Sequence, residues 1–200
     1  MLNWLVVRAP WAWPVIRGPM RRFFDRAALG WDQRTSAGSV AHLAPLAAAL
    51  LHVNPAPERA LEVGTGTGEG ALLIAREFPQ AGVRGVDLSE EMIRGAKAKV
   101  GLDPEGRVAF RVADAAALPY GDGSFDLIAH LNMPPFTAEV ARVLRPGGHV
   151  IVASSWGSAT PFFTPTAALD WGFAKQGIEL AAAGEAGDGR YWVGRKPLDG

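Results

Sequence analysis

The chain has 200 residues, 48% of them hydrophobic and 20% charged, a composition typical of one globular domain with a sizeable core. Twenty basic residues balance twenty acidic ones, so the overall charge gives no indication of binding to nucleic acid. The absence of cysteine excludes disulfides, thiolate metal ligands and a cysteine nucleophile. No apolar run reaches the length of a membrane span or of a signal-peptide core, and we expect a cytoplasmic protein.

Residues 1–54 are expected to form an N-terminal helical arm and lid, followed by one α/β domain over residues 55–200. The first 20 residues contain three tryptophans and three prolines among aliphatic residues: Trp4, Trp11, Trp13, Pro10, Pro14 and Pro19. The prolines are expected to prevent a long helix there. Two interpretations remain open, an arm that packs over the domain and a flap that contacts a lipid-like substrate or a membrane surface.

Helical periodicity begins at Met20. The apolar residues that share one face of this predicted helix are Met20, Phe23, Phe24, Ala27 and Trp31. Trp31 and Asp32 are expected to end it. After a polar break at residues 33–38, a second helix is predicted over residues 40–51, kinked or restarted at Pro45.

The most informative stretch is LEVGTGTGEG, residues 61–70. A short buried strand leads into glycines at alternate positions, Gly64, Gly66 and Gly68, and a helix begins at Ala71. Such a loop brings backbone N–H groups close to a ligand at a helix N-terminus. The looser dinucleotide pattern G-x-G-x-x-A fits from Gly66, so a nicotinamide or flavin cofactor stays open. Glu62, however, suits a ligand with an ammonium or sulfonium group better than a pyrophosphate.

The remaining chain alternates strands and helices, which predicts a doubly wound, mostly parallel Rossmann-like sheet of seven strands. Asp87 closes a strand about twenty residues beyond the glycines, where a carboxylate can accept both ribose hydroxyls. Further strands are predicted at residues 82–87, 107–112, 125–131, 178–183 and 190–193, and residues 144–153 are expected to form the turn into a fifth strand. Further helices are predicted after Ser89 and over residues 135–144 and 167–173.

The acidic-x-Gly-x-Gly-x-Gly pattern resembles motif I of the class I S-adenosylmethionine-dependent methyltransferases. The segments VDLSEEMI (86–93), DAAALPYGDGSFDLI (114–128) and LRPGGHVIVA (144–153) are similar to segments that follow it in that family. The resemblance covers residues 58–153 strongly and the two ends only in outline. It implies that S-adenosyl-L-methionine is the cofactor, that helices before motif I form a lid, and that the seventh strand is antiparallel.

The resemblance also implies roles for particular residues. Glu62 would face the methionine amino group, and Asp87 would hold the ribose. Asp114 and Ala115 would lie at the adenine edge. The other residues expected around the cofactor are Gly64, Thr65, Gly66, Gly68, Leu88, Met92 and Leu131. Trp31 is expected in the lid, and Phe136 on the acceptor side.

Two catalytic candidates follow from the end of strand 125–131, which faces the donor methyl in this fold. His130 is a candidate general base, although a histidine satisfied in the core is the alternative. Asn132 begins NMPPF, which resembles the Asn/Asp-Pro-Pro-aromatic motif of amino-methyltransferases, but Met133 separates the asparagine from the prolines. An N-terminal start to the next helix is the alternative for that segment. We interpret His42, His52 and His149 as structural and expect no metal site.

These observations favour in-line methyl transfer to a small, rather apolar molecule, with no nucleic-acid partner and with peripheral membrane contact through residues 1–20 kept open. Two alternatives stay open: an amino-methyltransferase of protein or nucleic acid that uses residues 132–136, and a non-catalytic nucleotide-binding or NAD-dependent protein. The sequence does not define the oligomeric state.

Overall fold

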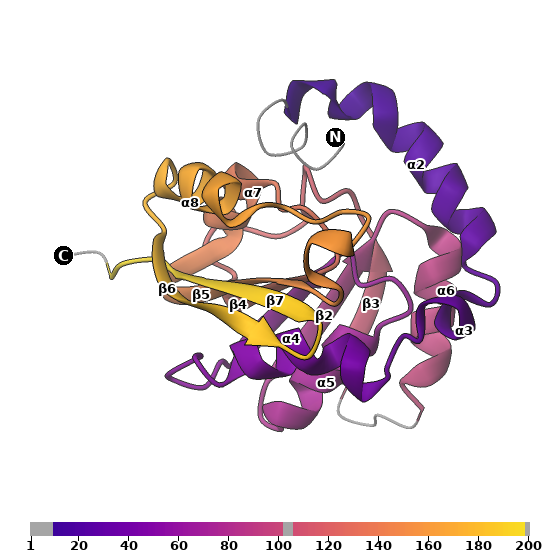
Figure 1. The fold of residues 1–200 in the computed structure, drawn as a ribbon, viewed down its shortest axis with the longest axis horizontal. Coiled ribbons are helices and arrows are strands. Elements are labelled where there is room, and N and C mark those ends of the chain that lie inside the picture. The colour runs from indigo at the N-terminus through magenta and orange to yellow at the C-terminus, as the bar shows by residue number, and fades with distance from the viewer. Residues whose placement is uncertain (1–9, 102–105, 199–200) are drawn as a thin grey trace.

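The structure, a computed structural model, describes residues 10–101 and 106–198. It is a seven-stranded sheet with helices on both faces (Figure 1). The strands are β1 (Arg59–Val63), β2 (Gly82–Asp87), β3 (Val108–Val112), β4 (Phe125–Leu131), β5 (Leu144–Ser154), β6 (Glu179–Ala186) and β7 (Gly189–Arg195). The α-helices are α2 (Trp13–Ala27), α3 (Trp31–Thr35), α4 (Val40–Leu50), α5 (Glu69–Glu77), α6 (Glu90–Lys99), α7 (Thr137–Val143) and α8 (Thr166–Ala174). Two short 3-10 helices are η1 (Pro10–Ala12) and η2 (Gly157–Ala159).

The strand order in the sheet is β3-β2-β1-β4-β5-β7-β6, which confirms the predicted fold class. The five strands from β3 to β5 are parallel, and β7 is antiparallel to both of its neighbours, β5 and β6. The order reverses between β1 and β4, so the carboxyl ends of these two strands diverge from a common crevice. In open α/β sheets such a switch point is where ligands bind.

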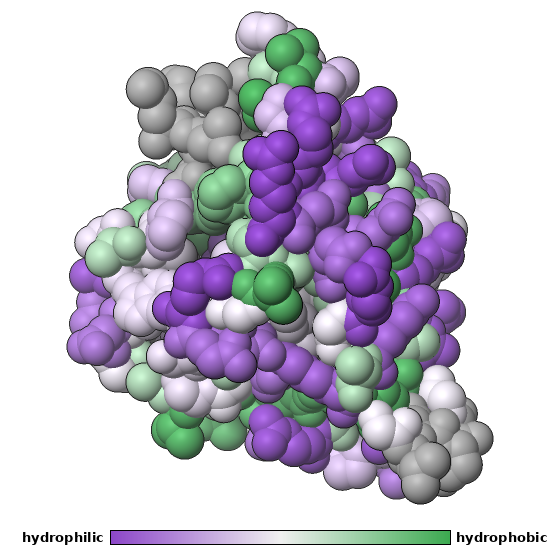
Figure 2. Space-filling model, turned by 90° about the vertical axis from the view of Figure 1, so that its right-hand side faces the viewer, coloured by the Kyte–Doolittle hydropathy of each residue, from purple (hydrophilic) through white to green (hydrophobic). Residues whose placement is uncertain are grey.

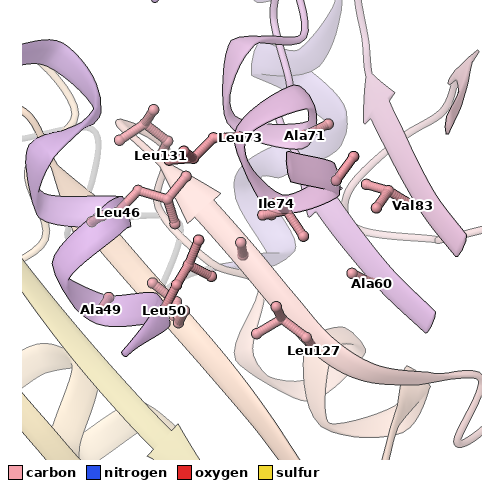
Figure 3. Close-up of a cluster of buried hydrophobic side chains, with 14 of the residues drawn as sticks. Leu46, Ala49, Leu50, Ala60, Ala71, Leu73, Ile74, Val83, Leu127 and Leu131 are labelled. Carbon is pink, nitrogen blue, oxygen red and sulfur yellow. The ribbon is translucent and has the colours of Figure 1, made fainter. Parts of the chain in front are cut away.

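The sheet is covered on both faces, with α4, α5 and α6 on one side and α7 and α8 on the other. Figure 3 shows part of the first layer, where Leu46 and Leu50 of α4 and Ile74 of α5 pack over Leu127 of β4. Burial on both faces explains why β4 reads FDLIAHL without alternation, because all seven of its residues are buried. Each fully buried Leu or Ile contributes about 1.5–3 kcal/mol, so this layer anchors the strand ends that carry the crevice.

The expectation that prolines prevent a long helix in the N-terminal segment is wrong for the described residues. Helix α2 runs for 15 residues through both Pro14 and Pro19. Pro14 lies in the first turn, where no intrahelical N–H bond is needed. Pro19 removes one bond, to the carbonyl of Val15, and that residue is 80% exposed, so water can satisfy the carbonyl. Trp4 lies outside the described residues.

The described part of the N-terminal segment that we expected to form a lid contains three α-helices rather than two. Gly30 adopts a left-handed conformation with φ of 69°, so Trp31 begins α3 instead of ending α2. Helix α4 is continuous across Pro45, and its first turn is capped by the Ser39 hydroxyl, which accepts from the backbone N–H of His42 at 3.1 Å.

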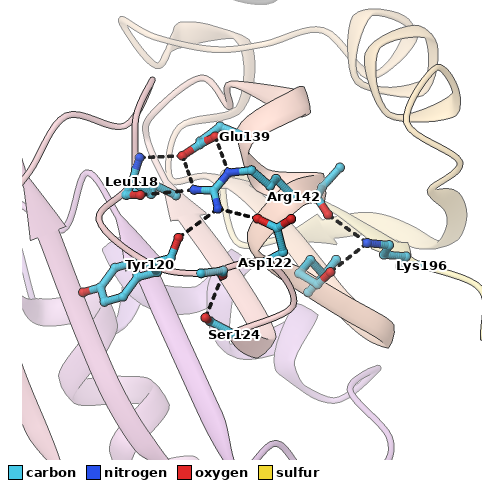
Figure 4. Close-up of polar contacts among 10 residues, drawn as sticks. Leu118, Tyr120, Asp122, Ser124, Glu139, Arg142 and Lys196 are labelled. Carbon is cyan, nitrogen blue, oxygen red and sulfur yellow. Dashed lines mark hydrogen bonds and ion pairs between the residues drawn. The ribbon is translucent and has the colours of Figure 1, made fainter.

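A cluster centred on Arg142 holds the loop between β3 and β4 against α7 (Figure 4). Its guanidinium donates to the backbone carbonyls of Leu118 and Tyr120 at 3.1 and 2.8 Å, and to the carboxylates of Asp122 and Glu139 at 2.6–2.9 Å. Glu139 in turn accepts from the Leu118 N–H at 2.5 Å. These bonds fix the loop that carries residues 113–116 toward the crevice.

Candidate functional site

The glycine loop connects β1 to α5 at the switch point. Its three glycines all have positive φ, 72° at Gly64, 51° at Gly66 and 90° at Gly68, a conformation that other residues rarely adopt. The loop is tied to β2, because the N–H groups of Gly64 and Thr65 both donate to the carbonyl of Val86, at 2.8 and 2.9 Å. The backbone therefore turns sharply at the carboxyl edge of the sheet.

Glu62 lies beneath this loop and is 1% exposed. One carboxylate oxygen accepts from the Ala71 N–H at 2.7 Å and from the Thr65 hydroxyl. Burial raises the pKa of Glu62 to about 7, although the two hydrogen bonds oppose that shift. The carboxyl group thus changes its charge near neutral pH.

Asp87 ends β2 beside the loop. Its two carboxylate oxygens accept from the backbone N–H groups of Gly66 and Ser89, both at 2.9 Å. Burial raises the pKa of Asp87 above its ordinary value, against the effect of these bonds. The side chain is held in a fixed orientation at the strand end.

A cavity of about 220 Å³ opens over the loop and the strand ends. The residues predicted around a cofactor that line it are Glu62, Gly64, Thr65, Gly66, Asp87, Leu88, Met92, Ala115 and Leu131. Trp31 and Phe136, predicted for the lid and the acceptor side, line it as well. The structure therefore brings together most of the residues that the sequence singled out.

Gly68 and Asp114 are two exceptions. Gly68 caps α5 and packs under Phe110, whose ring would lie 2.8 Å from a Cβ at that position. Asp114 directs its carboxylate at the lid, where Oδ1 accepts from the indole N–H of Trp13 at 2.8 Å and Oδ2 forms an ion pair with Arg17 at 3.3 Å. Neither residue is among those that line the cavity in the described part of the chain.

The structure does not support His130 as a general base. Its side chain is fully buried and is not among the described residues that line the cavity. Neither ring nitrogen has a hydrogen-bond partner among the described residues. Burial lowers the pKa of His130 to about 3, so the ring is a neutral core residue, which was the alternative interpretation.

Asn132 lines the cavity, but its amide is already engaged. The side-chain oxygen accepts from the Ser155 N–H at 2.8 Å, and the amide nitrogen donates to the Ser155 hydroxyl at 2.9 Å. Met133, the inserted residue, packs on Gly64, where its sulfur would lie 2.0 Å from an added Cβ. The amide thus joins the ends of β4 and β5. In this arrangement it is not free to accept hydrogen bonds from a target amine.

The lid is fastened to the cavity rim by polar contacts. Asp32 accepts from the Thr67 hydroxyl at 2.5 Å and pairs with Lys99 at 2.6 Å, and Lys99 also pairs with Glu69 at 2.7 Å. We call these four residues the Asp32 clasp. On α2, a second lid contact is made by Asp25, which accepts from the Ser89 hydroxyl at 2.6 Å.

Aromatic side chains form the lid side of the cavity. Phe24 contacts Trp31 and Phe162 with ring centroids 5.8 and 6.0 Å apart. Trp31 lies over the loop, with its indole nitrogen 3.9 Å from the position that a Cβ on Gly66 would take. His42 and Trp156 form an edge-to-face pair at 5.5 Å, and both line the cavity. The sequence singled out Trp31 alone from this group.

Among residues 10–101 and 106–198, no group of three or more His, Cys, Asp or Glu side chains is arranged to hold a metal ion. Within the same residues, no helix is long and apolar enough to cross a membrane.

A family described as a methyltransferase domain matches residues 60–148. The malonyl-[acyl-carrier protein] O-methyltransferase of Methylococcus capsulatus is 36% identical over 68% of this chain and 51% of its own length. The demethylmenaquinone methyltransferase of Deinococcus radiodurans is 32% identical over 62% of this chain and 48% of its own length. The chain thus spans about half the length of these curated relatives.

The fold agrees with that of solved methyltransferases. The methyltransferase in a complex with the Haloferax volcanii Trm112 activator has a TM-score of 0.71 at 21% identity, over 87% of this chain and 97% of that one. The strand order and the glycine-loop crevice define an open α/β domain with a ligand site at its switch point. The family match and the curated relatives support a class I S-adenosylmethionine-dependent methyltransferase.

The cavity fits the cofactor of this family, S-adenosylmethionine. The buried carboxylate of Glu62 and the partly buried carboxylate of Asp87 stand at its floor beside a loop whose backbone lines the open space. The pKa values of both carboxyl groups are raised by burial, so a cationic or hydroxyl-bearing ligand would stabilise their ionised forms.

Proposed function

We propose that the protein transfers a methyl group from S-adenosylmethionine to a small, apolar acceptor by in-line displacement. When bound, the cofactor supplies a methyl group already activated by the positive charge on its sulfur. The protein's part is to hold the acceptor close, aligned and dry. The observation that carries the proposal is one cavity lined by Asp87 and Leu88 at one side and by Phe24, Trp31 and Phe162 at the other.

The proposed binding roles follow from the geometry of the floor. Glu62 would pair with the methionine ammonium, and the loop residues Gly64, Thr65 and Gly66 would surround the methionine moiety. The Asp87 carboxylate would accept hydrogen bonds from the ribose hydroxyls, either in place of the bond from the Gly66 N–H or in addition to it. Leu88, Met92 and Leu131 would pack on the adenosine.

The adenine edge requires a rearrangement if Asp114 is to serve it beside Ala115. Both oxygens of that carboxylate are engaged by the lid, through Trp13 and Arg17. We propose that the indole N–H of Trp13 occupies the position of the adenine amine as a donor to Asp114 and gives way to it, or shares it, when the cofactor binds.

The apolar nature of the acceptor is supported by the aromatic lining and by the relatives. One of these relatives is named as a demethylmenaquinone methyltransferase, and another as a malonyl-[acyl-carrier protein] O-methyltransferase. The engaged amide of Asn132 argues against the amino-methyltransferase alternative.

We also propose that α2 contacts an anionic membrane surface. Trp11 and Val15 are each 80% exposed and Phe23 is 57% exposed. Arg22 and Arg26 are exposed beside Phe23. Figure 2 looks onto the side where α2 lies and shows hydrophobic and hydrophilic residues interleaved there. Apolar side chains among arginines suit the interface of anionic lipids.

Thermal unfolding with S-adenosylmethionine, S-adenosylhomocysteine and NAD in separate samples tests the cofactor assignment. A ligand at a hundred times its dissociation constant adds about 2.7 kcal/mol, which raises the melting temperature by several degrees. We expect this shift with the two sulfur nucleotides only. A shift with NAD alone would indicate a dinucleotide-binding protein instead.

Asp87→Ala should abolish the shift. Because Asp87 also holds the Gly66 and Ser89 N–H groups, each shift is measured against the same variant without ligand. Asp170 lies on α8, and its carboxylate accepts a hydrogen bond from the Trp192 indole. The control variant Asp170→Ala should keep the full shift. An undiminished shift in Asp87→Ala would rule out the proposed ribose contact.

A further inference from the structure

His42 is a buried histidine at the cavity, and it belongs to no recognisable sequence motif. It lies in the first turn of α4 and is 8% exposed. Its Nδ1 is buried and has no hydrogen-bond partner among the described residues. A polar atom left unpaired in a buried position costs stability, so its retention beside a ligand cavity calls for a role.

The position of His42 is fixed from the other side of the cavity. The Ser155 hydroxyl donates to the backbone carbonyl of His42 at 2.7 Å, and Ser155 is in turn held by Asn132 at 2.8 and 2.9 Å. The end of β4, the end of β5 and the start of α4 are thereby joined. Asn132 acts in this arrangement as a positioning residue for His42.

The other titratable side chains that line the cavity have partners. Glu62 is bonded to the Thr65 hydroxyl and the Ala71 N–H, and Glu69 is paired with Lys99. Asp87 accepts from two backbone N–H groups. Of the four titratable residues that line the cavity in the described part of the chain, His42 is the one with a free basic atom.

The surroundings suit a base that gains charge during turnover. Burial lowers the pKa of His42, so the ring is neutral at pH 7. The carboxylates of Glu69 on α5 and Asp32 on α3 oppose that shift and would stabilise the imidazolium, although Lys99 of α6 partly neutralises both. The N-terminal end of α4 itself favours the neutral ring.

We propose that His42 is the general base of the methyl transfer and that the acceptor is a flat aromatic molecule with an ionisable hydroxyl group. This inference rests on the proposed methyltransferase function. A lone pair of the acceptor oxygen forms the new bond to the methyl carbon. The carbon–sulfur bond breaks, and its electron pair stays on the sulfur. The hydroxyl proton passes to His42, which later releases it to water, so the products are an aryl methyl ether and S-adenosylhomocysteine.

The acceptor class follows from the walls and from the base. Phe24, Trp31, Trp156 and Phe162 offer ring faces and edges against which a planar molecule stacks. A phenol, with a pKa near 10 as in tyrosine, gives up its proton to imidazole far more readily than an aliphatic hydroxyl does.

The test uses 2-naphthol as the acceptor and 2-naphthalenemethanol as a matched alcohol on the same ring system. The full chain is assayed with saturating S-adenosylmethionine, and the methyl ether is detected by mass spectrometry. His42→Gln is compared with His52→Gln, because His52 is an exposed residue at the opposite end of the same helix. Binding of S-adenosylhomocysteine by calorimetry and of 2-naphthol by equilibrium dialysis are measured independently of turnover.

The wild-type protein and His52→Gln should methylate 2-naphthol and leave 2-naphthalenemethanol unchanged. His42→Gln should lower kcat about 100-fold or more while the two binding constants stay within about twofold. The wild-type kcat should rise with pH through an ionisation that His42→Gln lacks. If His42→Gln does not bind S-adenosylhomocysteine, two measurements on the wild type test the inference instead. These are the rise of kcat with pH and the preference for 2-naphthol over 2-naphthalenemethanol.

Two results would overturn the inference and leave the proposed function intact. One is a wild-type protein that binds S-adenosylhomocysteine but neither binds nor methylates 2-naphthol. The other is His42→Gln with the kcat and pH profile of the wild type. A wild-type protein that binds neither sulfur nucleotide would refute the proposed function itself, and this inference with it.

Discussion

Glu62 illustrates how much of the site depends on single residues whose charge is set by burial. With the pKa raised to about 7, the folded protein holds this proton more tightly than the unfolded chain, whose value is near 4.5. The stabilisation is therefore complete below about pH 4.5 and is lost as the pH rises through about 7. Without ligand, this loss amounts to about 3 kcal/mol.

Glu62→Gln should remove that loss, because the amide keeps an oxygen for Thr65 and Ala71 but carries no charge. In denaturant unfolding without ligand, the variant should gain stability relative to the wild type between pH 5 and pH 8. If Glu62 pairs with the methionine ammonium, wild-type affinity for S-adenosylmethionine should rise over the same interval, and that of Glu62→Gln should not. If the free energies of unfolding of the two proteins changed with pH in parallel, the raised pKa of Glu62 would be contradicted.

The residues of the cofactor floor could be predicted from the sequence because they are local in it. Glu62, the glycine loop and Asp87 lie within 26 consecutive positions of one β-α-β unit, and that unit has a strong pattern. His42 could not be found in this way. Its place at the cavity depends on Ser155, 113 positions away, and on the packing of α4 against β5 and β7. The prediction of His130 as a general base failed for a related reason. A position at the end of a strand does not reveal toward which face the side chain points.

At the scale of elements, the central strands matched their predicted bounds closely, and β2 and β4 matched them fully. β4 is a mostly apolar run, and β2, although it contains Arg84, has a clear end at Asp87. The lid was less predictable, because the cost of a proline depends on whether the carbonyl it leaves unpaired is exposed to water, as at Val15. Pairing of the lid with the domain, through Trp13 and Asp114 or through the Asp32 clasp, links positions that are far apart in the chain.

The Asp32 clasp should control how firmly α2 and α3 close over the cavity. Lys99→Gln removes the cation that joins Asp32 to Glu69 and leaves two partly buried carboxylates without it. We expect the free energy of unfolding to fall by about 1 kcal/mol, because the pairs are only partly shielded from water. Trypsin should cut several times faster after Arg26 and Arg34, exposed residues of the lid.

Arg94→Gln is the matched control for the clasp. It lies on the same helix, α6, and breaks an exposed pair with Glu91 that does not touch the lid. Its rate of cleavage after Arg26 and Arg34 should equal that of the wild type. Equal rates in Lys99→Gln as well would show that the clasp does not hold the lid.

The whole molecule combines a neutral overall charge with an uneven surface. The formal net charge is zero, yet α2 carries four arginines, Arg17, Arg21, Arg22 and Arg26, against one acidic residue, Asp25. The same side presents Trp11, Val15 and Phe23, while Trp13 and Ile16 pack inward on the second core cluster. The inner side of this segment packs on the domain, as the first interpretation expects, and the outer side is exposed and available for the proposed contact with lipid.

A triple substitution of the outer side tests the membrane proposal without removing Trp13, as a deletion of residues 1–20 would. The wild type should sediment with phosphatidylglycerol vesicles, less so with phosphatidylcholine vesicles, and less as salt is raised, because arginine–headgroup attraction is screened. Trp11→Ser, Val15→Ser and Phe23→Ser together should weaken binding at least about tenfold, equivalent to about 1.4 kcal/mol of lost apolar burial. The control replaces three apolar residues exposed elsewhere, Leu51, Leu180 and Leu198, by serine and should sediment like the wild type. If both triple variants bind vesicles equally well, α2 does not make the membrane contact. The affinity for S-adenosylhomocysteine is the control for folding: if it is unchanged in both variants, any difference in vesicle binding comes from the altered surface.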